Sequence, residues 1–395
     1  MRKVGQKAEA VLKDIDQHLN CDVPWQFVLN SICTQPHPVA VAAFTRSIAT
    51  NLGDVRIFKG TYELEKKAIA AMAGLLNAED CHGSLVSGGT EANLLAIYVA
   101  RKHACARRGD ISRPEVIVAE TVHFSMQKIF DMLGITPRTV EVDHRYKMDV
   151  SQVQRLINDN TIAIVGTAGT SEFGSVDPIE ELSRIAAHHD LYFHVDAATG
   201  GFIIPFARAL GYELPNFDFS LPGVCSITLD PHKYGLVNIP AGGIFFRTKE
   251  LHSMISLDSF FASTPVHRTF LGTRPGGAAA ASYATFETLG QDGFIETTKS
   301  NYQHMEYLVE RLESLGYQVP VAPELNIVIV ALADAIAVSR QLEARGWIIS
   351  VSKRFSNCLR LVINQHVDRE VIDRFLQVLQ QVTPDQTIAK EEAAS

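Results

Sequence analysis

A lysine follows a histidine just after an apolar stretch of the sequence, and this pair is the first candidate for covalent chemistry. The apolar run 225–229 leads into a turn that contains His232 and Lys233. A partly desolvated lysine favours its neutral amine, which is a nucleophile and forms a Schiff base with an aldehyde cofactor. An ordinary surface lysine in a turn explains the same dipeptide. Other segments must therefore decide between the two interpretations.

A glycine pair precedes a long helical pattern and predicts an anion site. Gly88 and Gly89 come just before Thr90, and apolar residues then recur at helical spacing over 92–107. The first N–H groups of a helix lack partners within it, and glycines let an anion approach without a Cβ in the way. A tight turn without any ligand explains the same pattern. The lack of a Gly-Lys-Ser/Thr sequence excludes a Walker loop.

Two charged residues accompany apolar runs that are typical of buried strands. Asp196 follows the run 191–195, and the small residue Ala198 lies two positions further on. A buried carboxylate needs a partner, which a protonated ring nitrogen would supply, although a helix cap or a structural acceptor is the alternative. Arg360 lies inside the run 358–363, where its guanidinium demands a carboxylate or phosphate from the protein or from a substrate.

The elements that must position these residues alternate between strand and helix. From 115 to 246 short apolar runs alternate with amphipathic helices, which predicts an α/β fold with a mostly parallel sheet. In such sheets ligands bind beyond the carboxyl ends of the strands, which selects His123, Thr167, Asp196 and the turn 230–233. The strands are expected at 116–119, 139–142, 162–166, 191–195 and 225–229.

The alternation ends after residue 246. Residues 257–268 have the composition of a long irregular loop, and such loops are often lids. A glycine-rich turn, two successive helices that part near 290, and a strand-helix-strand-strand-helix pattern follow. We expect four regions, which are an N-terminal arm (1–55), a large domain (56–290), a small C-terminal α+β domain (291–383) and a flexible tail (384–395).

Composition narrows the class of partner. The chain has 395 residues, 46% of them hydrophobic, and a net charge of -8 without a basic stripe, which argues against nucleic acid and membrane as partners. No apolar run approaches the roughly 18 residues of a membrane helix, and the first residues are too polar for a signal peptide. The cysteines lack metal-ligand spacing, so no metal is expected. We expect a cytoplasmic protein with a small-molecule partner.

Together the motifs closely resemble the group II pyridoxal-phosphate-dependent amino acid decarboxylases, and most of all the short archaeal-type L-tyrosine/L-aspartate branch. SGGTEA at 87–92, HVDAA at 194–198 and DPHKYG at 230–235 stand in the family's order, and the likeness runs from about residue 30 to 382. It implies the PLP-dependent transferase fold type I with a mostly parallel seven-stranded sheet. It also implies pyridoxal 5'-phosphate, an L-amino acid substrate of the aspartate, glutamate or tyrosine class, and a homodimer with a shared active site.

The resemblance assigns a role to each matching residue. Lys233 would hold the cofactor aldehyde as an internal aldimine, and Asp196 would keep the pyridine nitrogen protonated. Arg360 would bind the substrate α-carboxylate. The other implied cofactor contacts are His123 and Ala198 on the two ring faces, Thr167 at the ring side, Gly88, Gly89, Thr90 and His232 around the phosphate, and Gly272 and Thr273, whose loop would reach the partner subunit.

The sequence departs from the family pattern in two places. Many relatives carry a tyrosine in the lid that protonates the substrate carbon, whereas the segment 257–268 has no tyrosine and offers His267 as the nearest candidate acid. Without such an acid, oxidative deamination becomes a competing reaction. Arg56 stands where relatives tend to have glycine; it would pair with a distal acid group and favour aspartate or glutamate, or else it is a surface arginine.

Two other functions stay open. A carbon–carbon lyase of the sphingosine-phosphate lyase type shares the D-x-HKYG turn and the G[ST]RPGG loop. A catalytically silent relative that binds a partner is the second alternative, and the joint presence of Lys233, Asp196 and His123 argues against it.

Overall fold

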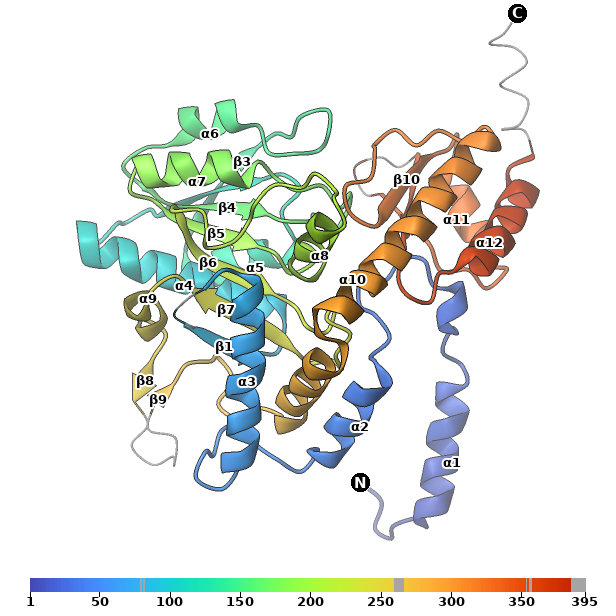
Figure 1. Ribbon diagram of the computed structural model, residues 1–395, viewed down its shortest axis with the longest axis horizontal. Coiled ribbons are helices and arrows are strands. Elements are labelled where there is room, and N and C mark those ends of the chain that lie inside the picture. The colour runs from blue at the N-terminus through green and yellow to red at the C-terminus, as the bar shows by residue number, and fades with distance from the viewer. Residues whose placement is uncertain (79, 81, 259–265, 353, 355–356, 385–395) are drawn as a thin grey trace, which may run out of the picture.

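The computed structural model describes the chain apart from residues 79, 81, 259–265, 353, 355–356 and 385–395. A large α/β part and a smaller C-terminal part lie on either side of the long helix α10 (Gly276–Ser314), which runs diagonally between them (Figure 1). The middle of the expected lid and nearly all of the expected tail fall outside the described residues.

The large part is built on a seven-stranded sheet in the order β1-β7-β6-β5-β4-β2-β3. Five neighbouring strands, β6 to β3 in this order, are parallel, whereas β7 is antiparallel to both β6 and β1. The predicted α/β class and its mostly parallel sheet are therefore confirmed. The strands are β1 (Gly83–Val86), β2 (Glu115–Ala119), β3 (Thr136–Val140), β4 (Thr161–Thr167), β5 (Tyr192–Asp196), β6 (Val224–Leu229) and β7 (Gly242–Phe246).

The central strands are apolar on both sides because helices cover both faces of the sheet. Every residue of β4 and of β5 is buried. Along β5, Phe193 packs into one hydrophobic core and Tyr192 into the other, as the two-residue period of a strand requires. Helix α4 (Gly89–Arg108) packs across β5, β6 and β7. His194 shares the face of Tyr192, so its ring points toward α4.

The parallel strands place their carboxyl ends at one edge. Thr167 at the end of β4 pairs in register with Asp196 at the end of β5, and Asp196 pairs with Thr228 of β6. The turn that carries Lys233 follows directly after β6. The edge where the sequence predicts a ligand site therefore collects the end residues of three adjacent strands.

Two predicted elements differ from the structure. The strand expected at 139–142 lies earlier, over β3, and contains Pro137; a proline is tolerated there because β3 is an edge strand. The described ends of the expected loop 257–268 form a short antiparallel pair, β8 (Leu257–Asp258) with β9 (Val266–His267), rather than irregular chain. Strands β1 and β7 were not predicted, since both are short and carry glycines.

The C-terminal part is an antiparallel sheet with two helices. Its strands are β10 (Ile327–Ala331), β12 (Cys358–Val362) and β11 (Ser350–Val351), with β12 in the middle. Helices α11 (Ala335–Glu343) and α12 (Arg369–Val382) accompany them. Helix α10 changes direction at Gly290, where φ is 56°, and this matches the predicted break between two helices.

The N-terminal residues lie along the outside of the molecule. Helices α2 (Pro38–Arg46) and α3 (Lys59–Leu75) pack against α10. Helix α1 (Ala8–Leu19) buries no residue and projects from the body (Figure 1). No helix within the described ranges is long and apolar enough to cross a bilayer. The remaining helices are α5 (Ser125–Leu133), α6 (Val150–Leu156), α7 (Ile179–His188), α8 (Ile204–Ala209) and α9 (Lys249–Ser253).

Candidate active site

A pocket opens at the carboxyl edge of the sheet, between the start of α4 and the turn after β6. It brings together nine of the residues that the sequence selects: Gly88, Gly89, Thr90, His123, Thr167, Asp196, Ala198, His232 and Lys233. Arg360 lies next to it and donates to the carbonyl of the lining residue Ser171. Seven further lining residues have no role assigned from the sequence: Ser87, Glu91, Asn93, Gly169, Ser171, Thr199 and Asp230.

The start of α4 forms the anion site at one end of this pocket. A Cβ on Gly88 would lie 2.8 Å from the ring of His232, and one on Gly89 would lie 2.9 Å from Oδ2 of Asp230. Strand β7 also presses on the turn, because a Cβ on Gly242 would come within 2.4 Å of Gly88. Only glycines fit here, and they leave the backbone N–H groups of the helix start facing the pocket.

Asp196 is held by donors from two directions. Its Oδ2 accepts a hydrogen bond from Nδ2 of Asn93 at 2.8 Å, and its Oδ1 accepts one from the backbone N–H of Ala198 at 3.1 Å. The Oδ1 atom of Asn93 in turn accepts from Thr228 at 2.7 Å and lies 3.0 Å from Nε2 of His194. The carboxylate is thus fixed at the pocket wall, where it can accept a proton-bearing ring nitrogen.

His194 supports this arrangement as a neutral ring. Burial lowers the pKa of His194 to about 4. Because its Nε2 faces the acceptor oxygen of Asn93, the proton sits on Nε2, and Nδ1 accepts from the hydroxyl of Ser226 at 2.8 Å.

The turn that carries Lys233 also contains Asp230, a buried carboxylate with no hydrogen-bond donor among the described residues. The Nζ of Lys233 lies 3.3 Å from Oδ2 of Asp230, and Nε2 of His232 lies 3.6 Å from the same oxygen. Asp230 is 1% exposed, and neither of its carboxylate oxygens accepts a hydrogen bond from a described residue. Thr34 donates to the carbonyl of Lys233 at 2.6 Å and so holds the turn from the N-terminal segment. Burial lowers the pKa of His232.

His123 lies in the loop after β2, half-buried at the pocket. Its Nδ1 lies 2.8 Å from Oγ of Ser125 and accepts the backbone N–H of that residue at 3.3 Å. Burial lowers the pKa of His123, which favours a neutral ring with an apolar face. Such a ring is suited to stacking on a flat heteroaromatic group.

Arg360 lies next to the pocket, on β12 of the C-terminal part. It is 8% exposed, and burial lowers its pKa. Its guanidinium donates to the backbone carbonyls of Ser171 at 2.7 Å and Asn30 at 2.9 Å. Among the described residues it forms no ion pair with a carboxylate. A buried cation of this kind is suited to an anionic ligand.

Five residues selected from the sequence do not line the pocket of their own chain. Arg56, Gly272 and Thr273 are exposed, His267 is half-buried in β9, and Arg360 is buried beside the lining residue Ser171. The described residues also contain no group of three or more His, Cys, Asp or Glu that could hold a metal ion.

The residues that sequence reasoning missed are mostly long-range partners. Asn93 lies 103 positions before Asp196, and no local pattern links the two. Its position one helical turn after Gly89 was the available signal, since both then share the face of α4 that meets the sheet. Asp230 lies inside the turn that the edge rule selected, but its burial without donors is visible only in the structure.

The pocket fits pyridoxal phosphate. The glycine start of α4 suits the phosphate, Asp196 suits the ring nitrogen, and Lys233 lies on the same wall. Asp230 adds a buried carboxylate that lies 3.3 Å from Nζ of Lys233 but accepts no hydrogen bond from a described residue, which indicates a wall suited to a polar ligand.

The whole-chain fold matches solved structures of one class. A sphingosine-1-phosphate lyase from Burkholderia pseudomallei superposes with a TM-score of 0.90 at 24% identity, covering 100% of this chain and 94% of that one. A glutamate decarboxylase from Lactobacillus brevis gives 0.89 at 22%, covering 98% and 94%. The likeness establishes the fold, which is the predicted fold type I.

Sequence comparison then shows to which family within that class the chain belongs. Residues 3–332 match the pyridoxal-dependent decarboxylase conserved domain. The L-aspartate decarboxylase of Thermococcus kodakarensis is 41% identical over 383 residues, 96% of this chain and 98% of its own. The L-aspartate/L-glutamate decarboxylase of Pyrococcus horikoshii is 40% identical over 96% and 98%. The chain therefore belongs to the pyridoxal-dependent decarboxylases, and the predicted family, enzyme class and cofactor are confirmed.

Replacing Asn93 with alanine is expected to weaken cofactor binding. The substitution removes a hydrogen bond to a carboxylate, so the dissociation constant for pyridoxal phosphate should rise roughly 10- to 100-fold. Absorbance titration of the cofactor-free protein measures it. The matched control is Asn158→Ala, which removes an exposed hydrogen bond from a side-chain amide to Glu115. It should leave the dissociation constant unchanged. Equal affinity in the Asn93 variant and in the wild type would contradict this role.

The buried ring of His194 predicts a loss of stability in acid. Its pKa is about 4 in the folded protein against 6.5 for the unperturbed group, so the unfolded chain binds more protons between these values. The contribution of His194 to the free energy of unfolding is therefore complete above about pH 6.5 and is lost as the pH falls toward 4. At pH 5 the loss is about 2 kcal/mol. Urea unfolding of wild type and His194→Gln from pH 7.5 to 5 measures it; identical pH dependence in both would refute the assignment.

Proposed function

We propose that this decarboxylase acts on L-aspartate, releasing CO2 from the α-carboxylate and leaving β-alanine. The observation that carries the proposal is the buried guanidinium of Arg360, which has backbone carbonyls but no carboxylate as described partners. Aspartate is also the substrate printed in the names of the Thermococcus and Pyrococcus relatives. The described pocket lining is mostly small and polar, which suits a short dicarboxylic acid better than an aromatic side chain.

Arg360 is proposed to bind the substrate α-carboxylate. The planar fork of an arginine binds a carboxylate through two parallel hydrogen bonds, and this fixes the direction of the carboxylate as well as its position. The bonds to Ser171 and Asn30 hold the fork in place before substrate arrives. The bond that breaks can thereby be oriented across the plane of the cofactor ring.

The other residues are proposed to hold the cofactor. Lys233 attaches to its aldehyde, Asp196 holds the proton of its ring nitrogen, and the start of α4 binds its phosphate. Pyridoxal phosphate supplies a ring that takes up the electron pair left when the carboxylate departs. His123 and Ala198 pack on the ring faces, with Thr167 at the ring side and His232 beside the phosphate.

The proton that replaces CO2 on the α-carbon must come from a group that reaches the pocket. His267 lies in β9, outside the pocket of its own chain. As the acid it would have to act from the partner subunit, whereas Lys233 and His123 face the pocket directly. The expected cytoplasmic location stays a prediction of the sequence.

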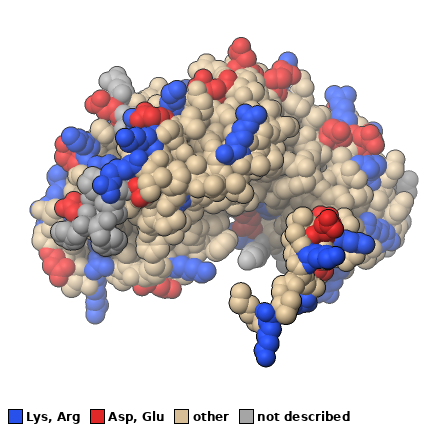
Figure 2. All heavy atoms as spheres, turned by 90° about the horizontal axis from the view of Figure 1, so that it is seen from below, with Lys and Arg blue, Asp and Glu red and all other residues tan. Residues whose placement is uncertain are grey.

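A homodimer with a shared site is part of the proposal. Helix α1 exposes Val11, Leu12, Ile15 and Leu19, and the loop that carries Gly272 and Thr273 is exposed as well. Much of the face in Figure 2 is uncharged, with Lys, Arg, Asp and Glu scattered mainly along its margins and no broad basic patch. The exposed apolar side chains of α1 favour association with another protein surface.

Substrate preference and the role of Arg360 are tested together. Purified enzyme with pyridoxal phosphate should release CO2 from aspartate with a higher kcat/KM than from glutamate or tyrosine. Arg360→Lys keeps the charge but loses the fork, so KM for aspartate should rise roughly tenfold or more. Arg340→Gln is the matched control and should leave KM unchanged because Arg340 is an exposed residue of α11 that does not line the pocket. No CO2 from any of the three amino acids would refute the proposal, and an unchanged KM in Arg360→Lys would refute the role of the arginine.

The dimer is tested by sedimentation velocity at micromolar concentration. The full chain should sediment as a dimer, and the double substitution Leu12→Glu with Ile15→Glu should shift it toward monomer, because it places charges on the apolar face of α1. A wild-type monomer in the presence of cofactor would contradict the shared site. The control is the pair of substitutions Lys13→Glu and Gln17→Glu. Both lie on the same helix but outside the group of apolar residues named above.

A further inference from the structure

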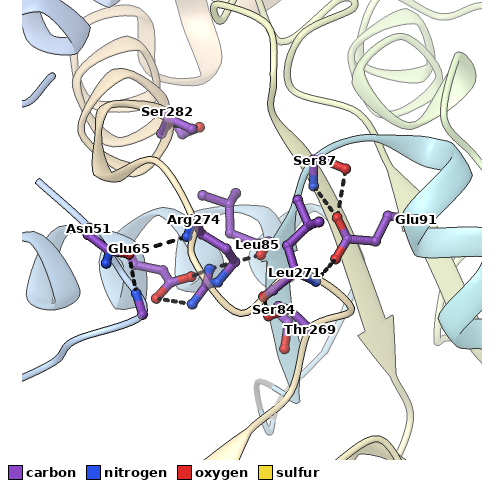
Figure 3. Close-up of polar contacts among 12 residues, drawn as sticks. Asn51, Glu65, Ser84, Leu85, Ser87, Glu91, Thr269, Leu271, Arg274 and Ser282 are labelled. Atoms are coloured by element: carbon purple, nitrogen blue, oxygen red, sulfur yellow. Dashed lines mark hydrogen bonds and ion pairs between the residues drawn. The ribbon is translucent and has the colours of Figure 1, made fainter. Parts of the chain in front are cut away.

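Glu91 lies immediately behind the anion site, in the first turn of α4, and is 7% exposed. A buried carboxylate is costly without donors. Its Oε2 accepts the backbone N–H of Ser87 at 2.8 Å and the hydroxyl of the same residue at 2.6 Å. Figure 3 shows this pair at the junction of β1 and α4. Glu91 thereby holds the turn that presents Gly88 and Gly89 to the phosphate.

The other oxygen of the same carboxylate holds a segment far away in the sequence. Oε1 accepts the backbone N–H of Phe270 at 3.0 Å and that of Leu271 at 3.3 Å. The side chains of Phe270 and Leu271 are 64% and 40% exposed, so burial does little to hold this end of the loop 269–275. The position of this end therefore depends on the hydrogen bonds to Glu91 (Figure 3).

A different carboxylate holds the far end of the loop. Arg274 forms an ion pair with Glu65 of α3 and donates to the carbonyl of Leu85 at 3.0 Å. Its backbone carbonyl accepts from Leu52 at 3.0 Å, and its N–H donates to Asn51 at 3.3 Å. These contacts do not involve the anion site. The loop thus has one anchor that touches the phosphate turn and one that does not.

We propose that Glu91 is a positioning residue that couples phosphate binding to the placement of the loop 269–275. Phosphate bound at the start of α4 restrains the turn, the turn restrains Glu91 through Ser87, and Glu91 restrains the N–H groups of Phe270 and Leu271. Because this loop carries Gly272 and Thr273, the inference extends the proposed shared site: cofactor bound in one pocket orders the loop offered to the second pocket.

Hydrogen–deuterium exchange of the full-length protein with and without pyridoxal phosphate tests the coupling. In the wild type, saturating cofactor should slow exchange in peptides that contain residues 87–90 and also in peptides that contain 270–271. The Glu91→Gln variant replaces one acceptor oxygen by a donor, so it cannot serve both segments. At saturating cofactor the variant should keep the protection at 87–90, whereas amide exchange at 270–271 should be roughly tenfold faster than in the wild type.

The matched control is Glu65→Gln, which loosens the other anchor. It should raise exchange at 274 with and without cofactor but retain the effect of cofactor on 270–271. Glu91→Asp, which keeps the charge but is too short to span both segments, gives the same test if Glu91→Gln does not fold. Undiminished cofactor protection at 270–271 in a folded Glu91 variant would overturn the proposal and assign that protection to direct contact with the second subunit. Because the readout is exchange, failure to decarboxylate aspartate would leave this test intact.

Discussion

A buried chain of hydrogen bonds between helix α4 and strands β5 and β6 governs the geometry of the site. Asn93 binds Asp196 through its amide nitrogen and binds Thr228 and neutral His194 through its oxygen. Each member has a partner, so the low dielectric of the interior strengthens the network instead of penalising it. The network fixes the helix start, the proposed phosphate site, relative to Asp196, the carboxylate proposed to meet the ring nitrogen.

The charge of the site follows from the same arrangement. The carboxylate of Asp196 lies at the end of β5, whereas that of Asp230 lies beside Gly89 at the start of α4. Asp196 suits a cationic ring, and the positive end of α4 suits an anionic phosphate at the other end of the ligand. Arg360 is the proposed second anion position; it belongs to the C-terminal part rather than to the sheet, so a substrate bound there would lie between the two parts of the chain.

The sequence predicts those pocket residues that lie next to an apolar run. Thr167, Asp196 and Lys233 each follow such a run, and the edge rule for parallel sheets brings them together although they are far apart in the chain. Asn93 and Glu91 could not be assigned in this way, because the partners of Asn93 and the second pair of partners of Glu91, Phe270 and Leu271, lie more than a hundred residues away and depend on how α4 packs. Strands β1 and β7 were missed because their glycines weaken the apolar pattern; Gly242 of β7 is required by its close contact with Gly88.

The central claim is that Lys233 carries the cofactor, and peptide mapping tests it most directly. Treating the cofactor-loaded enzyme with borohydride reduces a lysine–aldehyde linkage to a stable amine, and mass spectrometry of the digest then locates the label. The account predicts a single labelled peptide that contains Lys233, and no labelled peptide in Lys233→Ala. A label on another lysine, or a loaded wild-type enzyme without any labelled lysine, would contradict it.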